Sequence, residues 1–553
     1  MLTAIRIGNF KAFAEAQRIP MRPLTLIYGA NSSGKSSLIH SLIFARHALE
    51  TGDLDVHRTN VGGDAVDLGG FRQFIHRRDV GRRLEWSAEL DTLSFAGRLA
   101  ELLAPVKRLT IFLSIGIALD NQGKPLPSAI PEIYSYELIG DDRSLVRMSK
   151  RQDKLQLDRL DHEHPIFREV LKAIVETSTT TESIQPSDFE GLDEAITELV
   201  PEISASVGKF LPEGLVKSDA STSSSQVALF PVSRGRRKED LAAAVRFFIP
   251  RTLDDLINGI GLGVTEELYR LQYLGPLRSY PPRHLAFSQH HDPNWFAGGG
   301  YAWDVVRRDP KVREIVNAWL TAPDRLQTPY EIVVRDLVAI DQLDEPIIQG
   351  LEQIEGYPVP VVRSSEAEEA GWGEKEPWID IEEEARRLKE LIRGWDLEKL
   401  NELIMIDRRS NTIVSHRDVG IGVSQILPVL ISAYASQNQI IAIEQPEIHL
   451  HPAIQADLGD VFIHSALGEA KNRFLIETHS EHILLRVMRR MRETYDKKLR
   501  RGDHSVRPSD VMVLFVERDG TRSIVREMPL NERGELVKAW PGGFFEEGLR
   551  EVF

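Results

Sequence analysis

Apolar and polar positions alternate with two different periods along the chain, and the changes of period mark the expected elements. Residues 1–50 predict a strand, a turn, a second strand, a glycine-rich loop and a helix, in that order. From about residue 80 to 160 the alternation is typical of antiparallel strands, as in LTIFLSIGIAL and IYSYELIG. Two Ser/Thr-rich stretches, 177–188 and 218–226, separate short helical patterns and indicate flexible loops within an insertion.

The second half of the chain returns to strand patterns, at residues 330–340 and again at 403–418. A helical pattern, VSQILPVLISAYAS, then leads into the apolar strand IIAIE at residues 440–444. After it we expect a helix, the strand RFLIETHS, a basic helix and a final strand pair within 511–525. No repeat of 20–50 residues and no long heptad run interrupts this order.

The most specific chemical signal is a complete G-x-x-x-x-G-K-S sequence from Gly29 to Ser36. It follows the apolar run LTLIY and precedes a helical run, which is the strand–loop–helix setting of a phosphate loop. In such a loop the glycines let backbone N–H groups close around phosphate oxygens, and the helix N-terminus adds positive potential. Lys35 would reach the β- and γ-phosphates, and the Ser36 hydroxyl would ligate Mg²⁺.

A phosphate loop needs an acidic partner for its metal, and IIAIE is the one apolar run that we identify as ending in a suitably placed carboxylate, Glu444. The next residue is Gln445, where many nucleotide hydrolases carry a catalytic glutamate. A glutamine can orient water but cannot accept its proton at neutral pH, so slow hydrolysis or an ATP-locked state is expected. Glu447 is the substitute base, with His449 and His479 as further candidates; the alternation of Glu447, His449 and His451 also allows a less favoured metal site.

Composition places these motifs in an ordinary globular protein of 553 residues, 42% hydrophobic and 27% charged. There are no cysteines, which excludes disulfides and thiolate metal sites. No apolar window is long enough to cross a membrane, so a cytoplasmic location is expected. The net charge of −15 disfavours general nucleic-acid coating, although the basic stretch 486–501 is a candidate local patch or, more simply, a solvated helix face.

The order of motifs resembles that of ATP-binding-cassette ATPases. The phosphate loop is followed by a glycine-serine helix start, DVGIGVSQ, then by IIAIEQPE and by Thr478-His479-Ser480 at the end of a strand. The resemblance implies two ATP molecules held between two heads, so that the functional unit is a homodimer or a higher homo-oligomer. Gly420, Gly422 and Ser424 would act across that dimer, and His479 would sense the γ-phosphate.

Within these ATPases, the motifs most resemble those of the bacterial AAA ATPases related to the overcoming-lysogenization-defect (OLD) proteins. The chain resembles them in NFKAF (9–13), GANSSGKSS, YLGPLR (273–278), DVGIGVSQILPVL, IEQPEIHLHP and ETHSEHILLR, and the tail WPGGFFEE is similar to a subgroup with a C-terminal domain of unknown function. The resemblance places Phe10 and Lys11 near the adenine. It assigns the phosphates and metal to Gly29, Asn31, Ser32, Ser33, Gly34, Lys35, Ser36 and Ser37, with Ser36 and Glu444 on Mg²⁺.

Three further assignments from this resemblance are looser. The loop with Gly69, Phe71 and Gln73 is a candidate glutamine loop, and Arg278 either reaches the site or pairs structurally with a carboxylate. OLD proteins often carry a Toprim nuclease, whose metal needs an early glutamate and a later Asp-x-Asp on separate strands. The tail offers only Glu517-Arg518-Asp519, so we expect no nuclease in this chain.

We therefore expect an α/β P-loop NTPase of the ABC type, with a mixed sheet, an antiparallel β subdomain and a helical insertion. The expected segments are 1–98, 99–270, 271–400, 401–500 and 501–553. The expected function is a slow ATPase that acts as sensor or scaffold for a separate effector, a nuclease or toxin, in anti-phage defence, with DNA or a phage protein as trigger. A Rad50- or SMC-like DNA-repair ATPase, a transporter subunit and a non-hydrolysing ATP-binding module are the alternatives.

Overall fold

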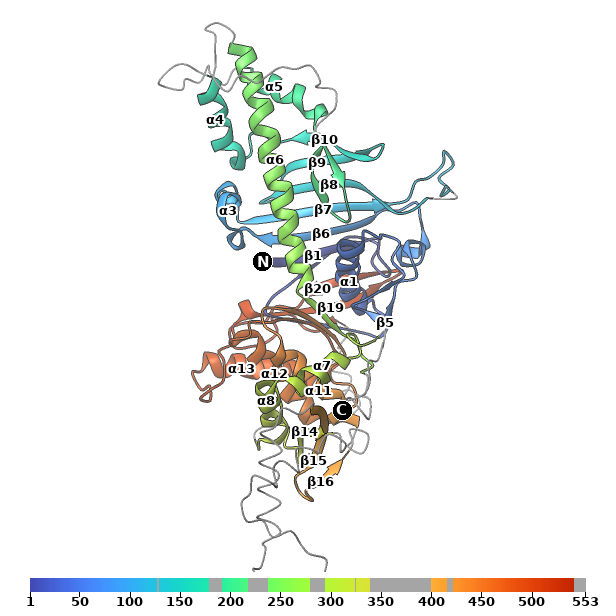
Figure 1. Ribbon diagram of the computed structural model, residues 1–553, viewed down its shortest axis with the longest axis vertical. Coiled ribbons are helices and arrows are strands. Elements are labelled where there is room, and N and C mark those ends of the chain that lie inside the picture. Colours follow the sequence, from blue (N-terminus) through green and yellow to red (C-terminus); the bar gives the residue numbers. More distant parts are fainter. Residues whose placement is uncertain are drawn as a thin grey trace, which may run out of the picture.

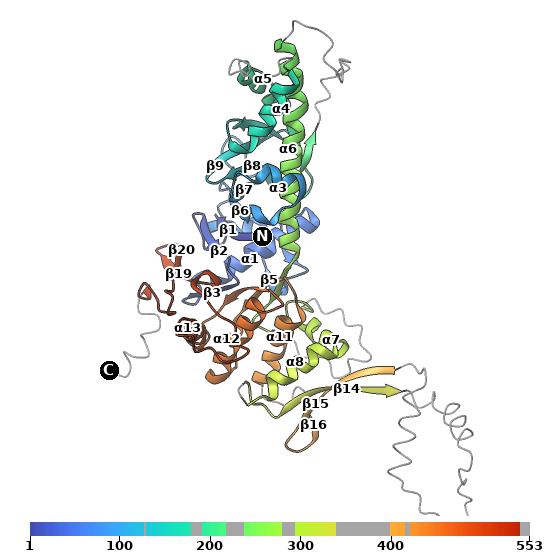
Figure 2. The same ribbon diagram turned by 90° about the vertical axis from the view of Figure 1, so that its left-hand side faces the viewer.

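The computed structural model describes residues 1–126, 129–178, 191–216, 237–278, 294–323, 325–338, 399–414 and 421–541. The molecule is elongated, with a large antiparallel sheet at one end, a mixed sheet in the middle and a small sheet at the other end (Figures 1 and 2). Most of stretch 177–188, all of stretch 218–226, Gly420 and most of the tail WPGGFFEE lie outside the described residues. Within the described part, no helix is both long and apolar enough to cross a membrane.

The large sheet has nine strands, and every neighbouring pair is antiparallel. Its order is β12 (Pro212–Val216), β11 (Ser204–Val207), β10 (Lys154–Leu160), β9 (Arg143–Arg151), β8 (Glu132–Gly140), β7 (Arg108–Gly116), β6 (Leu84–Asp91), β1 (Leu2–Gly8) and β2 (Gln17–Pro20). The strand alternation seen between residues 80 and 160 is therefore confirmed.

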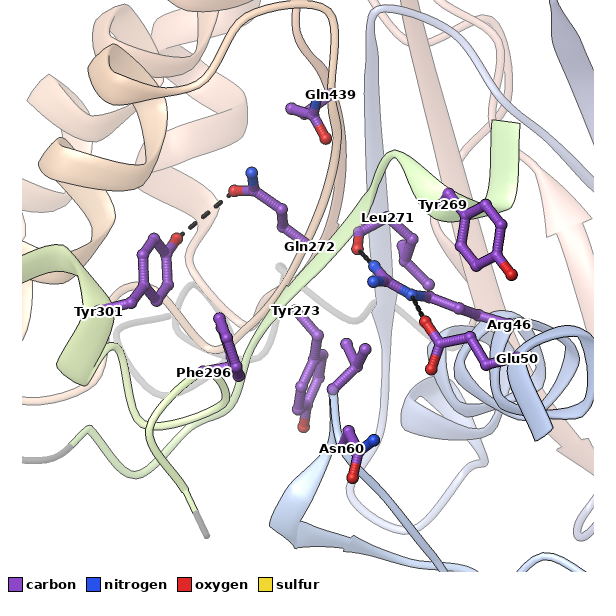
Figure 3. Close-up of a pocket in the computed structure, with 11 residues that line it drawn as sticks. Arg46, Glu50, Asn60, Tyr269, Leu271, Gln272, Tyr273, Phe296, Tyr301 and Gln439 are labelled. Atoms are coloured by element: carbon purple, nitrogen blue, oxygen red, sulfur yellow. Dashed lines mark hydrogen bonds and ion pairs between the residues drawn. The ribbon is translucent and has the colours of Figure 1, made fainter. Parts of the chain in front are cut away.

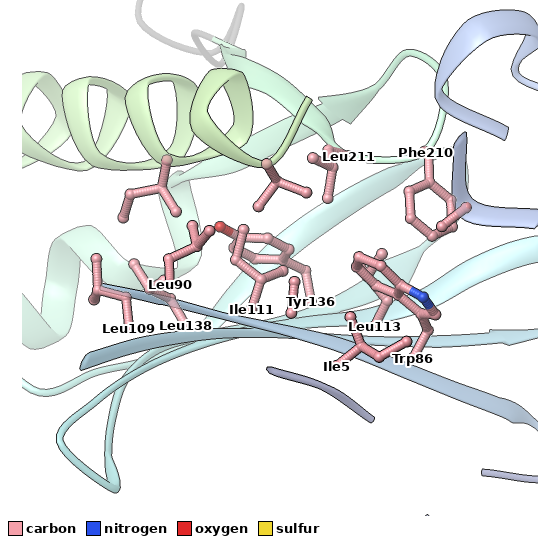
Figure 4. Packing of buried hydrophobic residues seen from close by; sticks show 14 of the residues in the cluster. Ile5, Trp86, Leu90, Leu109, Ile111, Leu113, Tyr136, Leu138, Phe210 and Leu211 are labelled. Atoms are coloured by element: carbon pink, nitrogen blue, oxygen red, sulfur yellow. The ribbon is translucent and has the colours of Figure 1, made fainter. Parts of the chain in front are cut away.

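One face of this sheet is covered by the long helix α6 (Arg237–Tyr269), which runs down the sheet toward the middle of the molecule (Figure 1). Figure 4 shows large apolar side chains of the strands, among them Trp86, Tyr136 and Ile111, packed beneath the helix. The remaining helices of this end are α3 (Gly97–Leu103), α4 (Arg168–Ser178) and α5 (Leu192–Leu199). Helix α6 thus connects the antiparallel end to the mixed sheet in the middle, because strand β13 (Leu271–Leu274) of that sheet follows it directly.

The mixed sheet in the middle has six strands in the order β13 (Leu271–Leu274), β17 (Ile440–Glu444), β18 (Arg473–Glu477), β3 (Leu24–Gly29), β19 (Val511–Asp519) and β20 (Arg522–Glu527). The first five are parallel, and β20 returns antiparallel to β19. This arrangement confirms the expected phosphate-loop α/β fold. Its strands come from four of the five expected segments, so the segments interleave in space.

Both faces of the six-stranded sheet are covered, which explains why its strands are continuous apolar runs. In β17, Ile440 and Ala442 face one core, and Ile441 and Ile443 face the other. Helix α1 (Lys35–Thr51) and the nine-stranded sheet cover the first face. The second is covered by α7 (Gly300–Arg308), α8 (Pro310–Thr321), α11 (Ile421–Ala435), α12 (Pro452–Leu467) and α13 (Glu481–Tyr495).

Two small sheets complete the described part of the chain. The strands expected near 330–340 and 403–418 form an antiparallel group of β14 (Tyr330–Val338), β15 (Lys399–Asp407) and β16 (Thr412–Val414). A short hairpin of β4 (Arg58–Thr59) and β5 (Gly63–Asp67) precedes the one-turn helix α2 (Phe71–Phe74).

Candidate nucleotide site

The phosphate loop joins the carboxyl end of β3 to the first residue of α1. Its two glycines are required by the backbone, since Gly29 and Gly34 have φ of +147° and +102°. A Cβ on Gly29 would come within 2.2 Å of the Val516 carbonyl oxygen, and one on Gly34 within 2.8 Å of the Ala12 Cβ. The loop is thus held tightly between β19 and the turn after β1.

The side chains of the loop differ in their exposure. Asn31 and Ser32 are exposed, Ser36 is half-buried, and Ser33 and Ser37 are buried. The Ser33 hydroxyl is buried with no hydrogen-bond partner within the described part of the chain. Because buried hydroxyls are rarely left unpaired, this oxygen is suited to meet a ligand atom.

Lys35 and Ser36 face a carboxylate that the strand order brings to the loop. The Lys35 ammonium donates to the carbonyls of Gly29 and Ala30 at 3.1 and 3.0 Å, and lies 3.9 Å from Glu477 Oε1. Ser36 also reaches this carboxylate with a hydrogen bond. Burial, and next the charge of Glu444, raise the pKa of Glu477 to about 7.

Glu444 ends β17 in register with Glu477, which ends the adjacent parallel strand. Its Oε1 accepts a hydrogen bond from the Tyr273 hydroxyl at 3.0 Å and lies 3.2 Å from His40 Nε2. The other ring nitrogen of His40 is 2.7 Å from the Lys11 ammonium, and burial lowers the pKa of Lys11 to about 8. Glu444 is therefore fixed in place by residues of α1 and β13.

The backbone after Glu444 turns sharply. Gln445 is in the left-handed region with φ of +46°, which is uncommon for a non-glycine residue and concentrates at functional sites. The guanidinium of Arg278 donates to the carbonyl oxygens of Glu444 and Gln445 at 3.2 and 3.3 Å. Burial lowers the pKa of Arg278 to about 10, so it remains charged at neutral pH. Its contacts here are to carbonyls, and it pins the turn that carries Gln445.

Glu447 and His479 lie together across this turn. Glu447 Oε1 accepts the backbone N–H of His479 at 2.7 Å. Glu447 Oε2 and His479 Nε2 are buried and have no hydrogen-bond partner among the residues that the structure describes. Burial raises the pKa of Glu447 and lowers that of His479, which makes the histidine neutral at pH 7.

The helix start expected to act across a dimer packs within the chain against the same turn. A Cβ on Gly422 would approach the His449 carbonyl oxygen to 2.9 Å, and Ser424 is 2% exposed. Gly420 lies outside the described residues. The role of this segment toward a second head remains a prediction.

Two residues expected near the adenine have different surroundings. The ring of Phe10 is fully buried and packs against Phe44 and Phe74, so it belongs to the core and cannot stack on a base. Lys11 contacts His40, as described above. In the loop that is the candidate glutamine loop, Phe71 is buried and Gln73 is exposed.

Comparison with known protein families finds matches for two segments of the chain. Residues 365–484 match the AAA ATPase domain family. Residues 506–553 match a protein family of unknown function, DUF3696. The AAA ATPase match covers less than half of the chain; it includes Glu444, Glu447 and His479 and lies downstream of the phosphate loop. Together, the phosphate-loop fold and the AAA ATPase domain identify an ATPase architecture.

Solved structures similar to the chain include heads of SMC proteins. The SMC head domain from Thermotoga maritima is 8% identical, with 96% of this chain and 99% of that chain covered and a TM-score of 0.33. The SMC head bound to the C-winged helix domain of ScpA is 11% identical, with 96% and 98% covered and a TM-score of 0.35. Such low values carry no argument about function. No curated protein matches the chain.

The side chains around the phosphate loop fit a nucleotide with a divalent cation. The phosphate loop would supply backbone donors and Lys35 to the phosphates, while Ser36, Glu444 and Glu477 carry oxygen atoms of the kind that Mg²⁺ prefers. A metal site of Glu447, His449 and His451 is not supported, because no group of three or more His, Asp or Glu in the described ranges is arranged to hold a metal. His451 instead caps α12 by accepting the N–H of Ala453.

Three residues of the site were missed in the sequence, namely His40, Tyr273 and Glu477. A signal existed for Glu477, because RFLIE is also an apolar run that ends in a carboxylate; IIAIE is therefore not the single run of this kind. His40 and Tyr273 gave no signal, since each becomes relevant only through contact with Glu444. Tyr273 also lines a cavity of about 430 Å³ beside Tyr301, Phe296 and Gln272 (Figure 3).

The basic stretch 486–501 and the tail acids have structural partners. Arg486 and Arg490 of α13 form ion pairs with Asp460 of α12, and the Arg490 guanidinium is 7% exposed. Arg486 and Arg490 therefore belong to the packing between the two helices, whereas the other basic residues of the stretch, among them Arg492, Lys497 and Arg500, are exposed, as expected for a solvated face. In β19, Glu517 pairs with Arg526, and Asp519 pairs with Arg522.

Proposed function

We propose that this protein binds ATP with Mg²⁺ and hydrolyses it slowly. The observation that supports this most strongly is the meeting of the phosphate loop, two strand-end carboxylates and the buried, unpaired oxygen of Glu447 at one edge of the sheet. Lys35 would stabilise the negative charge of the phosphates, and the cation would neutralise the charge that develops on the transferred phosphoryl group.

Glu447 is the proposed general base. One of its oxygens is fixed by the His479 N–H, so the other is held in a defined direction without a protein partner in the described structure. Burial raises the pKa of this carboxyl, which brings its basicity closer to neutral pH. Gln445, whose carbonyl side chain can only orient water, stands in the position where a stronger base is usual.

Steady-state phosphate release tests this assignment. We expect Glu447→Gln to lower kcat by about 10²- to 10³-fold, because general-base catalysis is worth roughly that much. Gln445→Glu should raise kcat, since it restores a carboxylate beside the water. Phosphate release by Lys35→Ala, which should not bind the phosphates, gives the background rate. Unchanged turnover in Glu447→Gln would remove Glu447 from the role of base.

A regulatory ATP-binding module without turnover is the second candidate. It is favoured by one observation, the glutamine at position 445 in a strained turn. The two candidates differ in phosphate release over hours from the purified wild-type protein. Release above the Lys35→Ala background supports the ATPase, whereas tight ATP binding without release supports the module.

At the cellular level we propose that ATP brings two heads together and controls a separate effector, a nuclease or toxin, in anti-phage defence, with DNA or a phage protein as trigger. The OLD-like motifs support this proposal. A Rad50-type alternative is less favoured, because the longest described helix, α6, packs on the nine-stranded sheet instead of extending as an arm. Phage plating on cells with the intact locus, compared with a Lys35→Ala locus, tests the role: equal plating would contradict it.

A further inference from the structure

The ends of β17 and β18 place two glutamates side by side next to the phosphate loop. Glu444 and Glu477 are paired in the register of neighbouring parallel strands, so both side chains lie on the same side of the sheet. The strand that carries Glu477 is hydrogen-bonded directly to β3, which leads into the loop, whereas the strand that carries Glu444 is not. Glu477 is therefore one strand nearer to the loop than Glu444.

The carboxylate of Glu477 points into the loop and is incompletely satisfied. Glu477 is 4% exposed; its Oε1 is 3.9 Å from the Lys35 ammonium, and it accepts a hydrogen bond from Ser36. Its Oε2 is buried with no hydrogen-bond partner in the described part of the protein. The Ser33 hydroxyl, on the loop itself, is a second buried atom in the same condition. Buried polar atoms without partners are uncommon, so these two atoms, both at the phosphate loop, are suited to meet ligand atoms.

We infer that Glu477 is a direct ligand of the divalent cation, together with Ser36 and Glu444, and that this cation is obligatory for nucleotide binding. The inference rests on the proposed nucleotide site and adds a ligand to it. Two carboxylates and a hydroxyl leave coordination positions for phosphate oxygens and water, as the octahedral preference of Mg²⁺ requires.

The charges around the loop explain why the cation is obligatory. Three carboxylates, Glu444, Glu447 and Glu477, surround the phosphate position, and the cations that interact with them in the described residues are Lys35, Lys11 and Arg278. A polyphosphate entering alone would meet like charges in a partly buried site, where repulsion is poorly screened. A divalent cation bound between the carboxylates and the phosphates turns this repulsion into attraction.

The inference predicts that Glu477→Gln changes nucleotide affinity in opposite directions with and without metal. Binding of a fluorescent, non-hydrolysable ATP analogue would be measured in EDTA and in Mg²⁺. In EDTA at pH 8, where the Glu477 carboxyl of wild type is mostly ionised, the variant should bind at least threefold more tightly than wild type, because one negative charge is gone. In Mg²⁺ it should bind at least tenfold more weakly, because a ligand is gone.

Direct binding of Mn²⁺, followed by the electron paramagnetic resonance signal of the free ion with the analogue present, gives a second readout. Glu477→Gln should lower Mn²⁺ affinity at least tenfold. Glu477→Asp keeps the charge but has a shorter side chain, so it should also lower Mn²⁺ affinity. Its affinity for the ATP analogue in EDTA should equal that of wild type. Glu517→Gln is the matched control, since it neutralises a glutamate of β19, a strand of the same sheet, and this glutamate pairs with Arg526. It should match wild type in both assays.

The outcomes separate this inference from the proposed hydrolysis. The inference would be overturned if Glu477→Gln melted normally and bound Mn²⁺ as tightly as wild type. If that variant also lost turnover, Glu477 would act as a base instead. A wild-type protein without any turnover would contradict the proposed hydrolysis and leave the metal and nucleotide results standing.

Discussion

At the scale of single residues, the site is defined by glutamates in unequal environments. Glu444 is held by Tyr273 and His40, Glu447 by one backbone N–H, and Glu477 by Ser36 and the nearby Lys35. Burial raises the pKa of both Glu447 and Glu477, and for Glu477 the value reaches about 7. A site of this kind stores unfavourable free energy that a bound cation can release.

The raised pKa of Glu477 makes a prediction about stability in the absence of metal. Because its folded pKa of about 7 exceeds the usual 4.5, the folded state holds this proton more tightly, and wild-type stability falls as pH rises across that window. The glutamine in Glu477→Gln cannot ionise, so the stability of this variant does not fall for that reason as pH rises. In EDTA we expect the variant to be more stable than wild type by on the order of 2 kcal/mol at pH 8, and by much less at pH 4.5.

Thermal melting of wild type and Glu477→Gln from pH 4.5 to 8 measures this difference. Glu517→Gln is the control for removing a glutamate charge from the same sheet. A difference between Glu477→Gln and wild type that stays constant over this pH range would show that ionisation of Glu477 is not its cause.

At the scale of elements, α12 and α13 are joined by a partly buried ion-pair network. Asp460 accepts from the Arg490 guanidinium at 2.7 and 2.8 Å and also pairs with Arg486. Burial opposes ionisation of Asp460, but the two arginines outweigh it, and its pKa is lowered. This pair of helices follows β17 and β18, so its packing supports the turns that carry Glu447 and His479.

Asp460→Asn should lower the free energy of unfolding by about 3 kcal/mol, because it removes the buried carboxylate that Arg486 and Arg490 share, although Arg490 keeps Glu493 and Asp503 as partners. Asp142→Asn is the contrasting variant: its exposed pair with Arg108 should be worth less than about 1 kcal/mol. Urea denaturation at pH 7 compares them. Equal, small losses would mean that solvent already screens the α12–α13 network.

At the scale of the whole molecule, the ATPase sheet is assembled from distant parts of the chain. The phosphate loop near residue 30 meets carboxylates at 444 and 477, and α6 links the sheet to the antiparallel end. The N-terminal turn of α11, expected to face a second head, is packed against His449 in a single chain. Pairing of heads would therefore build on a site that is already largely assembled.

We expect ATP with Mg²⁺ to shift the protein to a dimer in size-exclusion chromatography with light scattering. Glu447→Gln should accumulate the dimer, because it binds ATP without splitting it, and Lys35→Ala should not respond to ATP. Glu517→Gln should behave as wild type. An assembly state indifferent to both ATP and Lys35→Ala would contradict the paired-head proposal.

Much of the fold and part of the candidate site could be predicted from local sequence. The phosphate loop was recognisable because Gly29, Gly34 and Lys35 must occur at fixed spacing between a strand and a helix, and the strands of the nine-stranded sheet because side chains alternate with a period of two. Periodicity did not reveal that Phe10 is a core residue or that Arg490 pairs with Asp460, since each depends on a partner far along the chain.

The sequence by itself determined the phosphate loop, the strand that ends in Glu444 and the unusual Gln445, because each depends on neighbours within a few residues. Only the tertiary structure decided that Glu477 stands beside Glu444, that His40 and Tyr273 hold Glu444, and that Glu447 keeps one free oxygen. The physical reason is strand order: backbone hydrogen bonds place β18 between β17 and β3, and no local pattern specifies which strands will be neighbours.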